Sequence, residues 1–217
     1  LIPQLPLELW LTCVQDATKT SLLEDFYLGA VSTAIDTLLS GGTCVMDHAY
    51  LAAGYELETV ATLVRAYKEV GIRVFIAPLI QDQSLGAGLP AGRSHSSSAS
   101  RSTTEILKLM EEIVKEFHCP EAGINIAMGP TGFHRCSDEL LVGCSELSDR
   151  YNLCKHTHLL ETRAQRLLAK ERYGISAVEH LDRLGFLDRR TSLAHGVWLD
   201  DADMEILART RSTIVHN

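Results

Sequence analysis

Residues 158–162 read His158-Leu159-Leu160-Glu161-Thr162, and a short apolar run with Leu153 and Cys154 precedes them. The run predicts a strand over 152–158, and the periodicity that follows predicts a helix over 163–173. An imidazole and a carboxylate then lie at the same end of a strand. Such a pair suits metal-assisted hydrolysis, because imidazole binds divalent metals and a carboxylate moves the protons of the attacking water. The spacing is common by chance, so its meaning depends on the other strand ends.

Short apolar runs alternate with helix-like segments along the whole chain. We expect strands over 43–46, 72–76, 124–128, 152–158, 191–194 and 213–215, and helices over 21–40, 57–70, 103–117, 138–151, 163–173, 177–184 and 201–208. Residues 84–102, rich in Gly and Ser, are expected to form a long loop. The alternation predicts a parallel α/β sheet, either doubly wound or closed into a barrel. No glycine-rich phosphate loop follows the first strand, which disfavours dinucleotide binding.

Histidines gather at the predicted strand ends. Four of the six strands end near His: at Asp47-His48, at His156 and His158, at His195, and at His216. In a barrel the carboxyl ends of all strands converge on one mouth. In an open sheet they are spread along a line, so only neighbours meet. The gathering of imidazoles therefore favours a barrel with a metal site.

The composition narrows the possible partners and the location. The chain of 217 residues carries a formal net charge of −8, which argues against nucleic acid and anionic membranes as partners. Its six Cys are scattered without a CxxC pair, which favours reduced thiols and a cytoplasmic location. No apolar run is long enough to span a membrane. The start, Leu1-Ile2-Pro3, does not resemble a signal peptide or a natural start. We expect one domain over 1–217.

Several stretches resemble the amidohydrolase superfamily, in particular its cytosine/guanine deaminase and triazine-hydrolase branch. They are Pro6-Leu7 with Trp10-Leu11, residues 40–48 (SGGTCVMDH), Gly129-Pro130 with Cys136-Ser137, residues 156–162 (HTHLLET), residues 193–196 (LAHG) and residues 215–217 (VHN). The resemblance implies a TIM-type (β/α)8 barrel of which this chain holds strands two to seven. The family's first-strand HxH pair, its eighth-strand Asp and its β-sandwich segments have no counterpart here. The resemblance therefore describes an internal fragment, a partial metal-dependent hydrolase barrel domain.

The resemblance also implies roles for three residues. His158 is similar to the metal ligand on the fifth strand, with Zn²⁺ or Fe²⁺ as the metal. Glu161 is similar to the general acid/base. His195 is similar to the sixth-strand His that orients the attacking water and stabilises the tetrahedral centre. Simpler interpretations remain open: Glu161 as a carboxylate at a helix N-terminus, and both His as satisfied core residues.

Trp10, His48, Thr131 and His134 are the expected substrate-binding residues. His48 could equally be a hydrogen-bonded strand residue without a role in the pocket. His216 could lie in the pocket or in the core. His156 is expected at a deeper position in its strand. In the branch that acts on adenosine-type thioethers, a ribose-binding Glu precedes the Trp, and a His stands in the fourth-strand loop. This chain has Leu9 and Thr131 at those positions. We therefore expect a small N-heterocycle, such as a free base or a triazine, rather than a nucleoside.

The expected activity is aminohydrolysis, the metal-dependent cleavage of a C–N bond in such a ring. Two alternatives stay open: a catalytically incomplete scaffold without bound metal, and C–Cl hydrolysis within the same family. An open barrel exposes two strand edges, which pair readily with other chains. We therefore also expect a homo-oligomer.

Overall fold

The computed structural model describes residues 5–18, 20–84 and 101–217. The chain divides into two compact units. Unit 1 comprises Leu1–Pro78 and Ile113–Ile126, and unit 2 comprises Leu79–Glu112 and Ala127–Asn217. The loop expected over 84–102 lies mostly outside the described residues, which omit 85–100.

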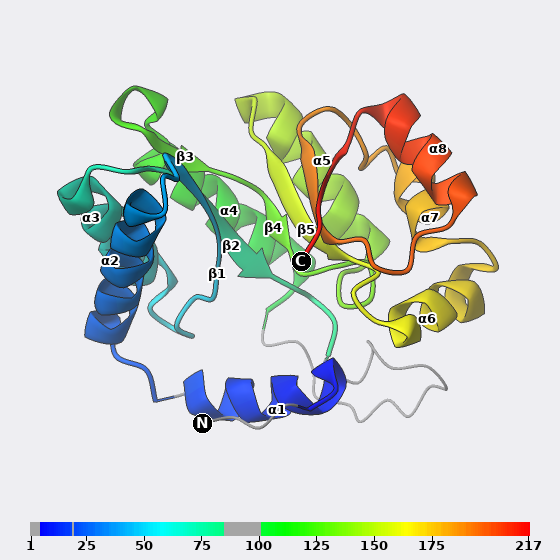
Figure 1. The fold of residues 1–217 in the computed structure, drawn as a ribbon, viewed down its shortest axis with the longest axis horizontal. Helices are drawn as coiled ribbons and strands as arrows, with labels where there is room; N and C mark the ends of the chain where they lie inside the picture. The colour runs from blue at the N-terminus through cyan, green and yellow to red at the C-terminus, as the bar shows by residue number, and fades with distance from the viewer. Residues whose placement is uncertain (1–4, 19, 85–100) are drawn as a thin grey trace. The chain divides into compact units, whose positions relative to one another are not determined.

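Unit 1 is built on three parallel strands in chain order. Its elements are α1 (Leu7–Thr18), α2 (Leu23–Leu39), β1 (Cys44–Ala49), α3 (Glu56–Val70), the first part of β2 (Arg73–Ile80), the last turn of α4 (Thr103–Phe117), η2 (Pro120–Ala122) and β3 (Ile124–Ile126). β1 pairs with β2, and β2 pairs with β3. Helices α2 and α3 lie side by side next to β1 (Figure 1). The buried residues of α2 are the small Ala30 and Ala34, which allow this close approach.

Unit 2 contains the remaining strands and most of the helices. Its further elements are β4 (Gly129–Pro130), α5 (Asp138–Tyr151), β5 (Lys155–Leu159), α6 (Arg163–Tyr173), α7 (Ala177–Arg183), β6 (Thr191–His195), α8 (Asp201–Thr210) and β7 (Thr213–Val215). β4 pairs with the end of β2, and β5, β6 and β7 pair in chain order, all in parallel. Met128, just before β4, is connected to β5 by two main-chain hydrogen bonds: its N–H donates to the Cys154 carbonyl, and its carbonyl accepts from the His156 N–H. In unit 2, β5, β6 and β7 thus lie in chain order, each beside the next.

The expected parallel α/β fold is confirmed, and most of its elements lie within a few residues of the predicted ranges. The strand expected over 152–158 begins only at Lys155, because Asn152 adopts a left-handed conformation, φ 53°, that ends α5. The strand expected over 124–128 ends at Ile126, and Gly129–Pro130 forms a separate short strand, β4. Helix α1 was not predicted at all. In the part of the chain that is described, no helix is long and apolar enough to cross a membrane.

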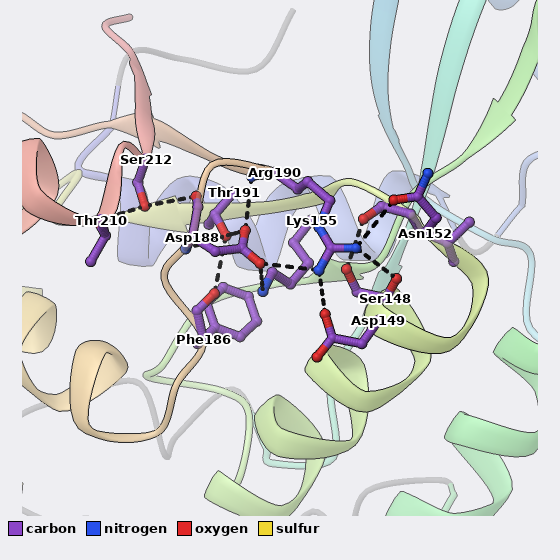
Figure 2. Close-up of polar contacts among 11 residues, drawn as sticks. Ser148, Asp149, Asn152, Lys155, Phe186, Asp188, Arg190, Thr191, Thr210 and Ser212 are labelled. Atoms are coloured by element: carbon purple, nitrogen blue, oxygen red, sulfur yellow. Dashed lines mark hydrogen bonds and ion pairs between the residues drawn. The ribbon is translucent and has the colours of Figure 1, made fainter.

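The amino ends of β5 and β6 are held by a buried ionic network (Figure 2). Lys155, the first residue of β5, is 1% exposed, and its Nζ lies 3.2 Å from Asp188 Oδ2. The same carboxylate accepts bonds from the Thr191 hydroxyl at 2.9 Å and from the Arg190 N–H at 2.8 Å. The Ser212 hydroxyl, just before β7, donates to the Asp188 carbonyl at 3.1 Å. One loop residue therefore fixes the starts of three strands.

Candidate functional site

The carboxyl ends of β5 and β6 bring His158 and His195 together in unit 2. The parallel register places Leu159 opposite His195, so the two imidazoles emerge from neighbouring strands at nearly the same level. Their ring centroids lie 5.5 Å apart, and the ring planes differ by 17°. Two residues that the sequence places 37 positions apart thus form a stacked pair, as the predicted site requires.

His158 is held by the loop that follows β4. Its Nδ1–H donates to the Thr131 carbonyl at 2.8 Å, and since a carbonyl can only accept, Nδ1 carries the proton of the neutral ring. The unprotonated nitrogen is then Nε2, the atom a metal would use. Burial lowers the pKa of His158 below its ordinary value, and this outweighs the raising effect of the Thr131 bond. A neutral imidazole with a fixed tautomer is the form in which His binds metals.

Glu161 and His195 face each other across the two strand ends. The distance from His195 Nε2 to Glu161 Oε2 is 3.6 Å, and the two side chains are 18% and 25% exposed, respectively. Burial, followed by the nearby His158 and His216, lowers the pKa of His195. The N-cap of α6 is Thr162, whose hydroxyl accepts from the Gln165 N–H. Thr162 therefore provides the side-chain cap that a simpler interpretation would have assigned to Glu161.

Two residues at these strand ends have left-handed backbones. Leu160 has φ 49° and His195 has φ 79°, a region that non-glycine residues rarely adopt. Two hydrogen bonds support these conformations: Gly196 N–H donates to the Leu159 carbonyl at 2.9 Å, and Trp198 N–H donates to the Leu160 carbonyl at 3.2 Å. Such strain persists only where neighbouring structure holds it, and it is frequent at functional sites.

Thr131 supports the site through its main chain. It is 5% exposed, and its hydroxyl donates to the Ile80 carbonyl at 3.0 Å, while its own carbonyl accepts from His158. These bonds anchor the β4 loop to β2 and orient the imidazole. The expected contact of Thr131 with substrate stays a prediction. Its carbonyl is a functional group that sequence reasoning missed, because any residue type supplies one.

His134 lies in the same loop and is 4% exposed. Among the described residues, its Nδ1 has no hydrogen-bond partner. Burial first, and then Arg135, His158 and Arg172, lower the pKa of His134 to about 3. The ring is therefore neutral near pH 7. A Cβ on Gly132 would lie 2.6 Å from His134 Nδ1, so the ring needs a glycine there, a requirement that no sequence signal revealed.

The other predicted residues occupy different places. Trp10 in α1 and His48 in β1 belong to unit 1, so their participation in a site with His158 stays a prediction. His156 lies deeper in β5, as expected, where its Nδ1 is 3.1 Å from the Ser192 hydroxyl. His216 is exposed, and its Nδ1–H donates to the His195 carbonyl at 3.1 Å. His216 thus contacts the main chain of the site.

The arrangement fits a metal ligand but does not provide a complete donor set. A neutral imidazole whose second nitrogen is hydrogen-bonded to a carbonyl matches the usual environment of a zinc-binding His. Among the side chains that the structure describes, no three from His, Cys, Asp or Glu are grouped as they would be around a metal ion. His158 therefore fits as one ligand among several.

The chain is similar in sequence to a known family of hydrolases and to several deaminases. The sequence profile described as "Amidohydrolase family" matches residues 2–217. The 5'-deoxyadenosine deaminase of Methanothermobacter thermautotrophicus is 32% identical over 98% of this chain and 45% of its own length. The 8-oxoguanine deaminase of Pseudomonas aeruginosa is 26% identical over 97% of this chain and 46% of its own.

Solved structures agree on the fold. The atrazine chlorohydrolase of Arthrobacter aurescens TC1, complexed with zinc, superposes with a TM-score of 0.84 at 20% identity, covering 99% of this chain and 48% of that one. The chain thus spans less than half the length of the curated relatives it matches.

Proposed function

The chain belongs to the amidohydrolase family, and from that premise we propose that the protein is a metal-dependent aminohydrolase. The reaction is hydrolysis of a C–N bond in a small N-heterocycle. One observation carries the proposal: Glu161 Oε2 lies 3.6 Å from His195 Nε2, beside a His158 whose Nδ1–H is committed to the Thr131 carbonyl. A proton-transfer group, a polar ring and a potential metal ligand thus lie at one sheet end.

His158 would hold the metal, Zn²⁺ or Fe²⁺, through Nε2. When bound, the metal would act as a Lewis acid and lower the pKa of water toward neutrality. Glu161 takes a proton from the attacking water and delivers it to the ring nitrogen or to the leaving amine. His195 is neutral near pH 7, because its pKa is lowered, and it can donate a hydrogen bond to the oxygen that becomes negatively charged.

We propose a free base or a triazine as the substrate. In the branch of the family that acts on adenosine-type thioethers, a Glu before the Trp binds ribose, and Leu9 stands at that position in this chain. A leucine side chain offers ribose no hydrogen bond. The 26% identical relative named 8-oxoguanine deaminase supports a base, whereas the 32% identical relative named 5'-deoxyadenosine deaminase points to a nucleoside. Comparing turnover of free bases with turnover of a nucleoside distinguishes these two substrate classes.

The architecture proposed for the chain is an incomplete (β/α)8 barrel. β1 and β2 would be barrel strands two and three, β3 with β4 the fourth, and β5, β6 and β7 the fifth to seventh. The parallel pairing of chain neighbours within each unit supports this assignment. It explains why the site residues lie at carboxyl strand ends.

The substitution Glu161→Gln in the full protein tests the function. It keeps the shape and removes the proton acceptor, so kcat should fall by about 10²- to 10⁴-fold while the bound metal remains. Ammonia release from guanine, 8-oxoguanine, cytosine, an aminotriazine and 5'-deoxyadenosine is measured together with metal content.

Glu112→Gln, on an exposed face of α4, is the matched control and should retain activity. Turnover of Glu161→Gln close to that of the unmodified protein would reject the role of Glu161. Faster turnover of 5'-deoxyadenosine than of every free base would reject the proposed substrate class and leave the aminohydrolase assignment intact.

A further inference from the structure

Unit 2 contains a cavity of ≈ 530 Å³ outside the candidate site. It is bounded by one face of α6, by the start of α7 and by the segment between β6 and α8. Small-molecule sites typically measure about 300–1,000 Å³. Its lining does not include His158, Glu161 or His195.

The cavity has an apolar floor and an aromatic rim. Leu160 and Ala177 line it and are 1% and 0% exposed. Leu167 and Trp198 also line it, and they are 53% and 38% exposed. An exposed indole beside a buried aliphatic floor is suited to cover the flat or alicyclic body of a ligand.

Three cations of α6 line the same cavity: Arg163, Arg166 and Lys170. Arg166 is paired with Asp200 at 3.0 Å. Lys170 donates to the Gly174 carbonyl, a neutral acceptor that leaves its charge uncompensated. Within the described residues, the guanidinium of Arg163 makes no hydrogen bond or ion pair.

The two carboxylates that line the cavity, Asp200 and Asp203, already accept hydrogen bonds from protein groups. Asp203 is 2% exposed and accepts a bond from the Asp200 N–H, as part of the cap of α8. Asp200 in turn accepts from the Asp203 N–H and from Arg166. Three cations against two carboxylates leave the cavity with an excess of positive charge, located at Arg163 and Lys170.

We propose that this cavity is a second binding site, for a small amphipathic monocarboxylate. The apolar body of the ligand packs against Leu160 and Trp198, and its carboxylate binds Arg163 and Lys170. Guanidinium and ammonium groups both form charge-assisted hydrogen bonds with carboxylates. The ligand would contact the residue before Glu161 and a residue shortly after His195, which are joined by the bond from Trp198 N–H to the Leu160 carbonyl.

Trp198 provides the readout. The chain has two Trp, so in a Trp10→Phe background all indole fluorescence comes from Trp198. Cyclohexanecarboxylate, which does not absorb at the excitation wavelength, is titrated against the protein. We expect a saturable change in emission. The uncharged cyclohexanecarboxamide and the cationic cyclohexylmethylamine should cause none.

Substitution identifies the carboxylate partners. Arg163→Gln combined with Lys170→Gln should weaken the affinity about tenfold or more, because both charge-assisted bonds are lost. Lys108→Gln, on an exposed position of α4, makes a similar charge change elsewhere and should leave the affinity unchanged. Circular dichroism confirms that each variant is folded. A linear response without saturation, an equal response to the amide, or unchanged affinity in the double variant would each overturn the proposal.

Discussion

At the scale of single residues, the usefulness of a histidine depends on what its ring nitrogens contact. His158 is suited to bind a metal because the Thr131 carbonyl, 27 positions earlier, holds its Nδ1–H. His134, three positions after Thr131, is instead enclosed, and its Nδ1 has no hydrogen-bond partner in the described part of the chain. Both rings are neutral near pH 7, so the two histidines differ in hydrogen bonding and in role.

Stability should depend on pH through His134. Its pKa is about 3 in the folded protein against an ordinary value of 6.5, so below pH 6.5 the unfolded chain binds a proton that the folded chain excludes. The stability that the neutral His134 provides is fully present above pH 6.5 and is lost as the pH falls toward 3. The free energy of unfolding should fall by up to about 1.4 kcal/mol per pH unit in this range from this residue.

Urea denaturation at pH 8, 7, 6 and 5 measures this effect in the protein and in His134→Leu. The free energy of unfolding of His134→Leu should decline less steeply as the pH is lowered. Stability at pH 8 provides the internal reference, because His134 is neutral there in both states. Parallel curves for the two proteins would contradict the assignment.

At the scale of elements, the two ends of one strand perform different tasks. The carboxyl end of β5 carries His158, and the amino end carries Lys155 in its ionic network. In parallel α/β proteins the carboxyl ends hold reactive groups, while the amino ends contribute to stability. The candidate site depends on this network indirectly, because the register of β5 against β6 sets the stacking of His158 on His195.

Asp188→Asn should destabilise the protein more than Lys155→Met does. Without the carboxylate, a cation that is 1% exposed loses its partner, and breaking a buried pair in this way costs about 3–5 kcal/mol. Lys155→Met removes the buried charge itself and leaves Asp188 bonded to Arg190 and Thr191. Thermal and urea unfolding of both variants measure the difference.

The double variant Asp188→Asn/Lys155→Met is the control. It should be more stable than Asp188→Asn alone, because no unpaired cation remains. If Asp188→Asn unfolds at the same urea concentration as the unmodified protein, the network does not support the strands.

At the scale of the whole molecule, the chain contains parts of a site whose complete donor set the described residues do not provide. A catalytic zinc site ordinarily uses three protein ligands and leaves one position open. His158 supplies one, and His195 lies beside it. The 217-residue chain alone should therefore bind zinc weakly and show no turnover.

Equilibrium dialysis against zinc, followed by elemental analysis, measures this binding. His158→Asn should remove what affinity there is, whereas His180→Asn, in α7, should not. Stoichiometric zinc that survives dialysis against a chelator, together with ammonia release, would show that the chain provides a complete site.

Self-association is the second expectation for the whole molecule. Among the described strands, β1 and β7 each pair with one neighbour only, and such edges can pair with another chain. Val215 in β7 is 42% exposed. Sedimentation velocity at rising concentration should show oligomers.

Val215→Lys should reduce this association, because an edge lysine opposes strand pairing. Met204→Lys, at an exposed position of α8, should leave it unchanged. A monomer at every concentration would contradict the expectation.

Local patterns in the sequence were sufficient to predict most elements. Helices α4, α5 and α6 have the predicted bounds, because helical periodicity and end signals are local properties. Helix α1 was missed because its residues were interpreted from the resemblance alone. The extension of β2 to Ile80 was also missed, because it depends on pairing with Gly129 and Pro130, which are distant in sequence.

The parallel α/β class, the family and the gathering of histidines at strand ends could all be predicted from the sequence, because each depends on local order along the chain. The tautomer of His158, the enclosure of His134 and the 3.6 Å distance from Glu161 to His195 became evident only in the folded chain. These features depend on main-chain groups and on register between strands. Hydrogen bonds to main-chain carbonyls are independent of residue type, so no sequence pattern encodes them, and they exist only after β4, β5 and β6 have been brought together.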